Sequence, residues 1–132
     1  MVAGLAVVDE VSISQKLLEV ILQNARSMYP RETILLLRGR VEKGRITITD
    51  IIIPPFATRG KGFSSFPLHM LPIDFSLVGS VHSHPSGNTT PSVEDVNHSY
   101  GRIAMIVAYP FMGKQHVSVC NHSGEEVPLE LT

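Results

Sequence analysis

The sequence predicts one α/β or α+β sheet domain, and we assign residues 1–132 to a single α/β unit. The length is that of one ordinary domain and is sufficient to bury a real core. Several β-branched and aliphatic runs have the length of strands, and two segments between them carry helix signals. Strands on both sides of two helices indicate a sheet packed against helices.

Residues 6–14, "AVVDEVSIS", predict a short strand that leads to a helix start, with Ser12 and Gln15 spaced as a capping box. Residues 15–30 then predict an amphipathic helix, and Pro30 prevents it from continuing. Its apolar stripe consists of Leu17, Leu18, Ile21, Leu22, Ala25 and Met28.

Residues 33–41 and 45–53 are aliphatic runs joined by "EKG", which predicts a hairpin. The unbroken "ILLL" indicates a strand covered on both faces. Further strands are expected at residues 75–84, 102–110 and 114–122, and "SVEDVNHSY" predicts a short helix closed by Gly101. The tail "SGEEVPLELT" carries little signal.

Composition excludes several classes of protein. The formal net charge is -1, which argues against nucleic acid or an anionic membrane as the main partner. The single cysteine, Cys120, rules out an internal disulfide and a cysteine-based zinc cage, and we expect it to be a small buried hydrophobe. The N-terminus does not resemble a signal peptide and no apolar run is long enough to span a bilayer, so we expect a cytoplasmic protein.

The stretch "HSHPSGNTTPSVED", residues 82–95, carries the candidate chemistry. Alternate side chains of a strand point to one face, so the imidazoles of His82 and His84 can meet at one point, with Ser83 turned away. Pro85 and Gly87 then turn the chain, and a helix that begins at Ser92 has Asp95 in its first turn. Folding that turn back brings the Asp95 carboxylate towards the imidazoles.

Two histidines and one carboxylate leave one tetrahedral position open for water, which is typical of catalytic zinc. A base is still needed, and Glu94 is expected to point away from the face of Asp95. The alternative is that Ser92 and Asp95, with Pro91 before them, only cap a helix. Ser92 can cap the helix and still present its hydroxyl to the metal site.

These residues resemble the JAMM (Jab1/MPN) motif, in which His-x-His is followed by seven residues and then Ser-x-x-Asp, without deviation here. The family also has an upstream glutamate where the first helix passes into the next strand. "YPRETILLLRGR" resembles that segment, with Glu32 at the glutamate position. The resemblance covers most of the chain and implies a mixed, curved β-sheet flanked by helices, of the cytidine-deaminase-like type.

The resemblance implies a hydrolase with one Zn²⁺ per chain, bound by His82, His84 and Asp95. It implies Glu32 as the general base and Ser92 as a hydrogen-bond donor to the oxyanion. Taken alone, Glu32 is an exposed carboxylate beside Arg31. Family members with the complete set are zinc metalloproteases, usually isopeptidases that cut after the C-terminus of ubiquitin or a ubiquitin-like modifier.

Three alternatives remain at this point. A non-catalytic scaffold module could keep the metal for structure, although scaffold members have generally lost motif residues. An amidase could release an amino acid from the C-terminus of a sulfur-carrier protein. "HPSGNTTPS" also resembles RadC-type proteins, but the helical DNA-binding module typical of those is absent. The chain after Asp95 has no room for the insertion that gives some eukaryotic relatives lysine-63 linkage specificity. The small stand-alone form most resembles archaeal or bacterial family members, and that resemblance implies a small ubiquitin-like or sulfur-carrier protein as the substrate.

Two further features have weaker signals. The Pro/Gly-rich stretch at residues 54–65, "PPFATRGKGFSS", is a candidate mobile loop that either borders the substrate groove, with Arg59 and Lys61 facing an acidic partner, or is simply solvated. His98 shares the helical face of Asp95, where a surface histidine is the simpler interpretation. Nothing in the sequence defines the oligomeric state.

Overall fold

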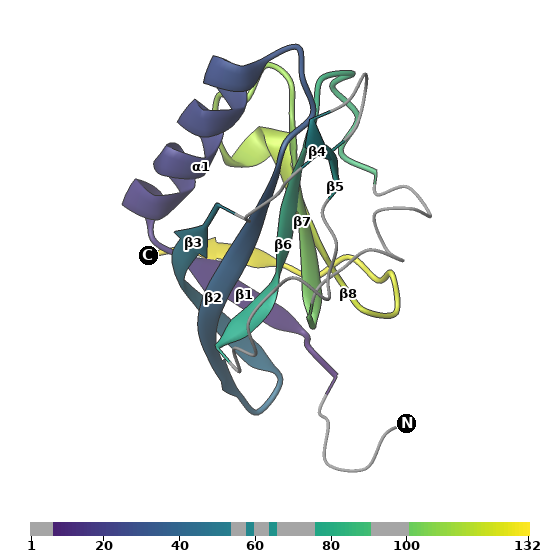
Figure 1. The fold of residues 1–132 in the computed structure, drawn as a ribbon. Coiled ribbons are helices and arrows are strands. Elements are labelled where there is room, and N and C mark those ends of the chain that lie inside the picture. The colour runs from purple at the N-terminus through teal and green to yellow at the C-terminus, as the bar shows by residue number, and fades with distance from the viewer. Residues whose placement is uncertain (1–6, 54–57, 60–63, 66–75, 91–100) are drawn as a thin grey trace.

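The computed structural model describes residues 7–53, 58–59, 64–65, 76–90 and 101–132, and its main feature is a seven-stranded sheet (Figure 1). The strand order is β8-β7-β6-β2-β3-β1-β9. The elements are β1 (Glu10–Ile13), α1 (Gln15–Met28), β2 (Ile34–Glu42), β3 (Arg45–Ile52), β6 (Leu77–His84), β7 (Ile103–Ala108), the 3-10 turn η2 (Lys114–His116), β8 (Val117–Asn121) and β9 (Leu129–Leu131). A separate short pair joins β4 (Thr58–Arg59) to β5 (Ser64–Ser65).

The sheet is mixed, as the family resemblance implied. β2 and β3 form the expected antiparallel hairpin, and its turn has positive φ at Lys43 (46°) and Gly44 (84°), the left-handed geometry of tight hairpins. β6 runs antiparallel to β2 and parallel to β7. β1 is parallel to both β3 and β9.

The α1 helix confirms the predicted amphipathic segment but corrects its cap. Ser14, with an extended backbone, is the N-cap, and its side chain accepts a hydrogen bond of 3.0 Å from the Leu17 N–H. The predicted capping box at Ser12 and Gln15 is wrong because Ser12 belongs to β1, where it pairs with Thr47. Helix geometry ends at Met28, just before Pro30.

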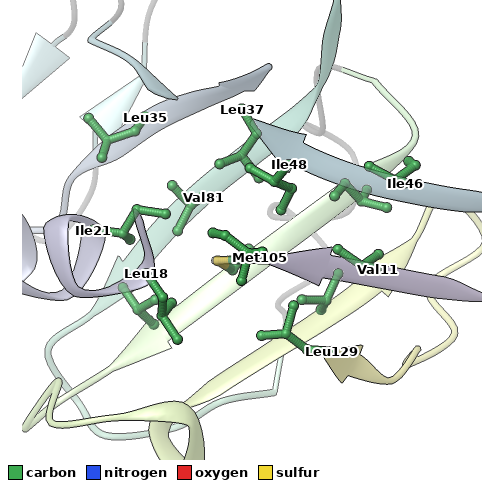
Figure 2. Close-up of a cluster of buried hydrophobic side chains, with 14 of the residues drawn as sticks. Val11, Leu18, Ile21, Leu35, Leu37, Ile46, Ile48, Val81, Met105 and Leu129 are labelled. Atoms are coloured by element: carbon green, nitrogen blue, oxygen red, sulfur yellow. The ribbon is translucent and has the colours of Figure 1, made fainter. Parts of the chain in front are cut away.

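One face of the sheet packs against α1 to form the main core. Figure 2 shows Leu18 and Ile21 of the helix pointing towards Val81 of β6 and Met105 of β7. A smaller cluster on the opposite face joins Ile34 and Leu36 to Ile52 and Leu77. Because odd and even residues of "ILLL" enter different clusters, the prediction that this strand is covered on both faces is confirmed.

The chain after β7 differs from the sequence prediction in two places. Residues 114–116, expected to be strand, form η2, whose turn is closed by the His116 N–H donating to the Gly113 carbonyl over 2.9 Å. The tail, from which little was expected, contributes β9 beside β1. Between β8 and β9 the chain folds back on β8 through a bridge between Cys120 and Glu126, so the curved sheet is nearly a barrel.

Several predicted features lie outside the described residues. These are the helix at 92–100 with its residues Ser92, Glu94, Asp95 and His98, and most of the stretch at 54–65, including Lys61. Within the described part of the chain, no helix has the length and apolarity to cross a membrane.

Candidate metal centre

His82 and His84 lie at the end of β6, which is an interior strand of the sheet. His82 is opposite Ile34 on β2 and Ile106 on β7, while His84 is opposite Ala108. Both histidines are half-buried, on the face of the sheet away from α1. Ser83, between them, points to the other side and is only 2% exposed. The prediction that the two imidazoles share one face is therefore confirmed.

The ring of His84 has a defined tautomer. Its Nδ1 lies 2.8 Å from the Asn88 carbonyl oxygen. Because a carbonyl only accepts hydrogen bonds, Nδ1 carries a proton, and in the neutral ring the lone pair is therefore on Nε2. Metal-binding histidines are commonly fixed in this way by a backbone carbonyl. The ring chemistry of His84 therefore fits a metal ligand.

The backbone around His84 is held as firmly as the ring. Its carbonyl oxygen accepts hydrogen bonds from the Tyr109 N–H at 3.0 Å and from the Gly87 N–H at 3.2 Å. The first bond continues the pairing with β7, and the second closes the turn that brings Asn88 under the ring. The orientation of His84 is thus set from two directions.

The ring of His82 contacts a neighbour on its own strand. Its Nε2 lies 3.2 Å from the hydroxyl oxygen of Ser80, two residues earlier and on the same face. A hydroxyl can donate to or accept from a ring nitrogen, so this contact is compatible with either tautomer. A metal bound through Nε2 would replace it.

Glu32 lies one residue outside the β2–β6 ladder. Thr33 follows Glu32 and faces Ser83, whose N–H donates to the Thr33 carbonyl over 3.0 Å. Extending this register by one residue sets Glu32 opposite His84, and opposed residues of a sheet share a face. Glu32 is half-buried, whereas its neighbour Arg31 is exposed. Glu32 is therefore less exposed than its neighbour, and its role as the base stays a prediction.

The predicted third ligand, Asp95, and the predicted oxyanion donor, Ser92, are not among the described residues, so their positions remain predictions. Within the described ranges, no three His, Cys, Asp or Glu side chains gather closely enough to hold a metal ion. The two imidazoles on one face, with one ring nitrogen already set for coordination, nevertheless form a donor pair that fits zinc.

A hollow of about 200 Å³ lies against β8, and no pattern in the sequence indicated it. Ser118 of β8 is opposite Ile106, which is opposite His82, so the hollow and the histidines share a face. The Ser118 hydroxyl donates to the Thr89 carbonyl over 2.6 Å and ties the segment after His84 to β8. The hollow is lined by Thr89, Thr90, Ser118, Val119, Cys120, Gly124 and Glu126.

Cys120 forms part of this wall and is 4% exposed. The prediction that it is a small buried residue in a strand is confirmed.

Residues 14–122 match the model of a family described as prokaryotic homologs of the JAB domain. The chain belongs to this family. A relative of this JAB-family chain is a probable metalloprotease of Haloferax volcanii. The two are 30% identical over 130 residues, which cover 93% of this chain and 80% of the relative.

Solved structures of the family have the same fold. A JAB1/MPN domain protein from Archaeoglobus fulgidus is 33% identical, with a TM-score of 0.66 over 92% of this chain and 98% of its own. A second structure, described as JAMM, a metalloprotease-like zinc site in the proteasome and signalosome, is 28% identical, with a TM-score of 0.65 over 95% and 98%. The predicted α/β fold and the resemblance to the JAMM/MPN family are confirmed.

Proposed function

We propose that this JAB-family chain is a zinc metallopeptidase that hydrolyses isopeptide or peptide bonds after the C-terminus of a small ubiquitin-like or sulfur-carrier protein. The observation that carries the proposal is the pair His82 and His84 on one face of β6, and the β2–β6 register, extended from Ile34 to Glu32, supports a place for Glu32 next to His84. The zinc site described for one structural neighbour, and the metalloprotease name of the Haloferax relative, support the same chemistry.

His82, His84 and Asp95 are the proposed zinc ligands. The tie between Ser118 and Thr89 supports this, because the chain leaves the described part at Thr90 above β8, on the histidine face. From β8 to β6 is two strand spacings, about 10 Å. The five residues from Thr90 to Asp95 can span up to about 17 Å, so the carboxylate is within reach of the histidines.

Zinc in this site supplies Lewis acidity towards water and towards a carbonyl oxygen. Glu32 accepts a proton from the attacking water and delivers it to the nitrogen of the leaving amine as the C–N bond breaks. Ser92 donates a hydrogen bond to the carbonyl oxygen as negative charge develops there. Water and a peptide or isopeptide bond are thus converted into a carboxylate and an amine.

The test uses a ubiquitin-like protein whose Gly-Gly tail is linked through an amide to a fluorescent amine. We expect the wild-type chain to release the amine and Glu32→Gln to lose about 10²–10⁴-fold in kcat, the typical contribution of a general base. Glu32→Gln should keep its zinc, measured by elemental mass spectrometry. The control His82→Ala/His84→Ala should lose both zinc and activity.

Each other outcome contradicts a defined part of the proposal. Full activity in Glu32→Gln would remove the base role from Glu32. About one zinc per chain, with no cleavage of any Gly-Gly amide by the wild type, would favour the scaffold alternative. Release of a free amino acid from a sulfur-carrier tail, without isopeptide cleavage, would favour the amidase.

A further inference from the structure

We propose that Ser83, the residue between the two histidines, is a positioning residue that holds Glu32 against the metal centre. Its buried hydroxyl fixes the point where β2 begins to pair with β6. This inference rests on the proposed function, because it concerns the placement of the proposed base.

The contacts between Ser83 and Thr33 carry the inference. Ser83 donates its N–H to the Thr33 carbonyl over 3.0 Å. In a regular antiparallel pair, the opposite residue returns this bond to the backbone carbonyl. Here the Thr33 N–H donates instead to the Ser83 hydroxyl oxygen at 2.8 Å, and the Thr33 hydroxyl lies 3.1 Å from the same oxygen.

These bonds lie where the ladder ends. β2 begins at Ile34. Thr33 comes just before this strand and still bonds to Ser83, and Glu32 is one residue further from the ladder. Opening the end of a strand costs little free energy unless side-chain contacts hold that end in place. Ser83 is 2% exposed, so its hydrogen bonds to Thr33 are shielded from water. The Ser83 hydroxyl therefore sets the position of the backbone that carries Glu32.

The histidines are held by other contacts. Their strand pairs with β7 through Ile106 and Ala108, and the His84 ring is fixed by the Asn88 carbonyl. Loss of the Ser83 hydroxyl should thus move Glu32 without moving the ring nitrogens. A misplacement of about 1 Å can cost about 10²-fold in rate. The expected defect is in kcat, with zinc content preserved.

The experiment compares Ser83→Ala with Ser83→Thr, which keeps the hydroxyl. Ser12→Ala is the matched control, because Ser12 and Thr47 form another cross-strand Ser–Thr contact, at 3.4 Å between β1 and β3, in a part of the sheet without a proposed catalytic residue. We expect kcat of Ser83→Ala to fall about 10–100-fold with KM and zinc unchanged. Ser83→Thr should recover most of the loss, and Ser12→Ala should keep wild-type kcat.

A second measurement does not depend on activity. Hydrogen exchange of the Thr33 amide, followed by NMR, should accelerate in Ser83→Ala but not in Ser12→Ala. If the wild type shows no hydrolysis, the proposed function fails, and the exchange of Thr33 still decides whether Ser83 holds the strand end. Unchanged exchange together with unchanged kcat in Ser83→Ala would overturn the inference.

If Ser83→Ala does not fold, a second variant, Thr33→Val, tests the same contact. Thr33→Val removes the Thr33 hydroxyl but keeps both backbone groups, so it should lower kcat by a smaller factor with zinc retained. Wild-type kcat in Thr33→Val, beside an unfolded Ser83→Ala, would assign Ser83 to stability alone and overturn its positioning role.

Discussion

The buried side chain of Asn121 joins three segments at the end of β8. Its Nδ2 donates to the Val8 carbonyl and to Glu125 Oε1, both at 3.2 Å. Its Oδ1 accepts from the N–H groups of Ser123 at 3.0 Å and Glu125 at 3.1 Å. The Asn121 side chain is 3% exposed and its bond to the Val8 carbonyl is buried, while its bonds to Ser123 and Glu125 reach towards the surface.

Asn121→Ala should lower the free energy of unfolding by about 1–3 kcal/mol, because it removes the donor to the buried Val8 carbonyl and the other hydrogen bonds of a buried side chain. Urea denaturation followed by circular dichroism measures this. The control is Gln23→Ala on the exposed side of α1, where a change within about 0.5 kcal/mol is expected. If Asn121→Ala lowers the free energy of unfolding no more than Gln23→Ala does, the hydrogen bonds of Asn121 contribute little to stability.

At the residue scale, the sequence predicted the features that depend only on residues close together in the chain. His82 and His84 share a face because strand side chains alternate, which needs no tertiary information. Glu32 required the family resemblance, because the register between β2 and β6 cannot be deduced from either strand alone. Asn121 was missed since its partner Val8 is 113 residues away.

Among the elements, β6 carries the site and fits closely against β7. A Cβ atom on Gly79 would lie 2.1 Å from the Ile103 carbonyl oxygen, closer than any real contact. Glycine at this position therefore allows the two strands to approach. The same pair of strands holds the backbone of His82 and His84 further along.

Gly79→Ala should force β6 away from β7 and lower both stability and zinc affinity. We expect a loss of at least about 2 kcal/mol in the free energy of unfolding, in the range of strained backbone substitutions. Urea denaturation and zinc titration measure the two effects. Gly124→Ala is the control: its φ is positive (83°), unlike that of Gly79, but no atom lies within 4 Å of its Cβ, so zinc affinity should stay unchanged. Equal zinc affinity in both variants would mean that the packing of β6 against β7 does not affect the proposed zinc site.

The elements predicted correctly are the longer ones, whose hydrophobic periodicity or turn residues can be recognised within one stretch of the sequence. The helix after Ser14 and the hairpin of β2 and β3 follow from periodicity and a turn. The cap was missed, because the spacing of Ser12 and Gln15 favoured Ser12, and only the pairing of Ser12 with Thr47 in β1 shows that Ser14 is the N-cap. β9 is three residues long and forms only against β1, so no local signal marks it.

In the whole molecule, the main core and the candidate metal centre lie on opposite faces of the sheet. The main cluster consists of apolar side chains between α1 and the sheet, and His82 and His84 lie on the other face. Burial of each large aliphatic side chain contributes about 1.5–3 kcal/mol. The described core therefore has a source of stability that does not depend on zinc.

Removal of zinc with a chelator should leave the far-UV circular dichroism and a cooperative melting transition in place, while Tm falls. A ligand at 100 times its Kd adds about 2.7 kcal/mol to stability, so returning zinc should restore Tm. His82→Ala/His84→Ala is the control, since its Tm should not respond to zinc. Loss of the folded spectrum on chelation would mean that the metal is required for folding.

The pairing of β1 with β9 also has a consequence for synthesis. A chain leaves the ribosome from its N-terminal end and its domains fold as units, yet Val11 and Ile13 pair with Leu129 and Leu131. Until the latter emerge, one edge of β1 has no strand beside it, and open edges invite pairing with other chains. The sheet is therefore completed only after β9 has been synthesised, and until then the nascent chain has an open edge at β1 that the folded sheet covers.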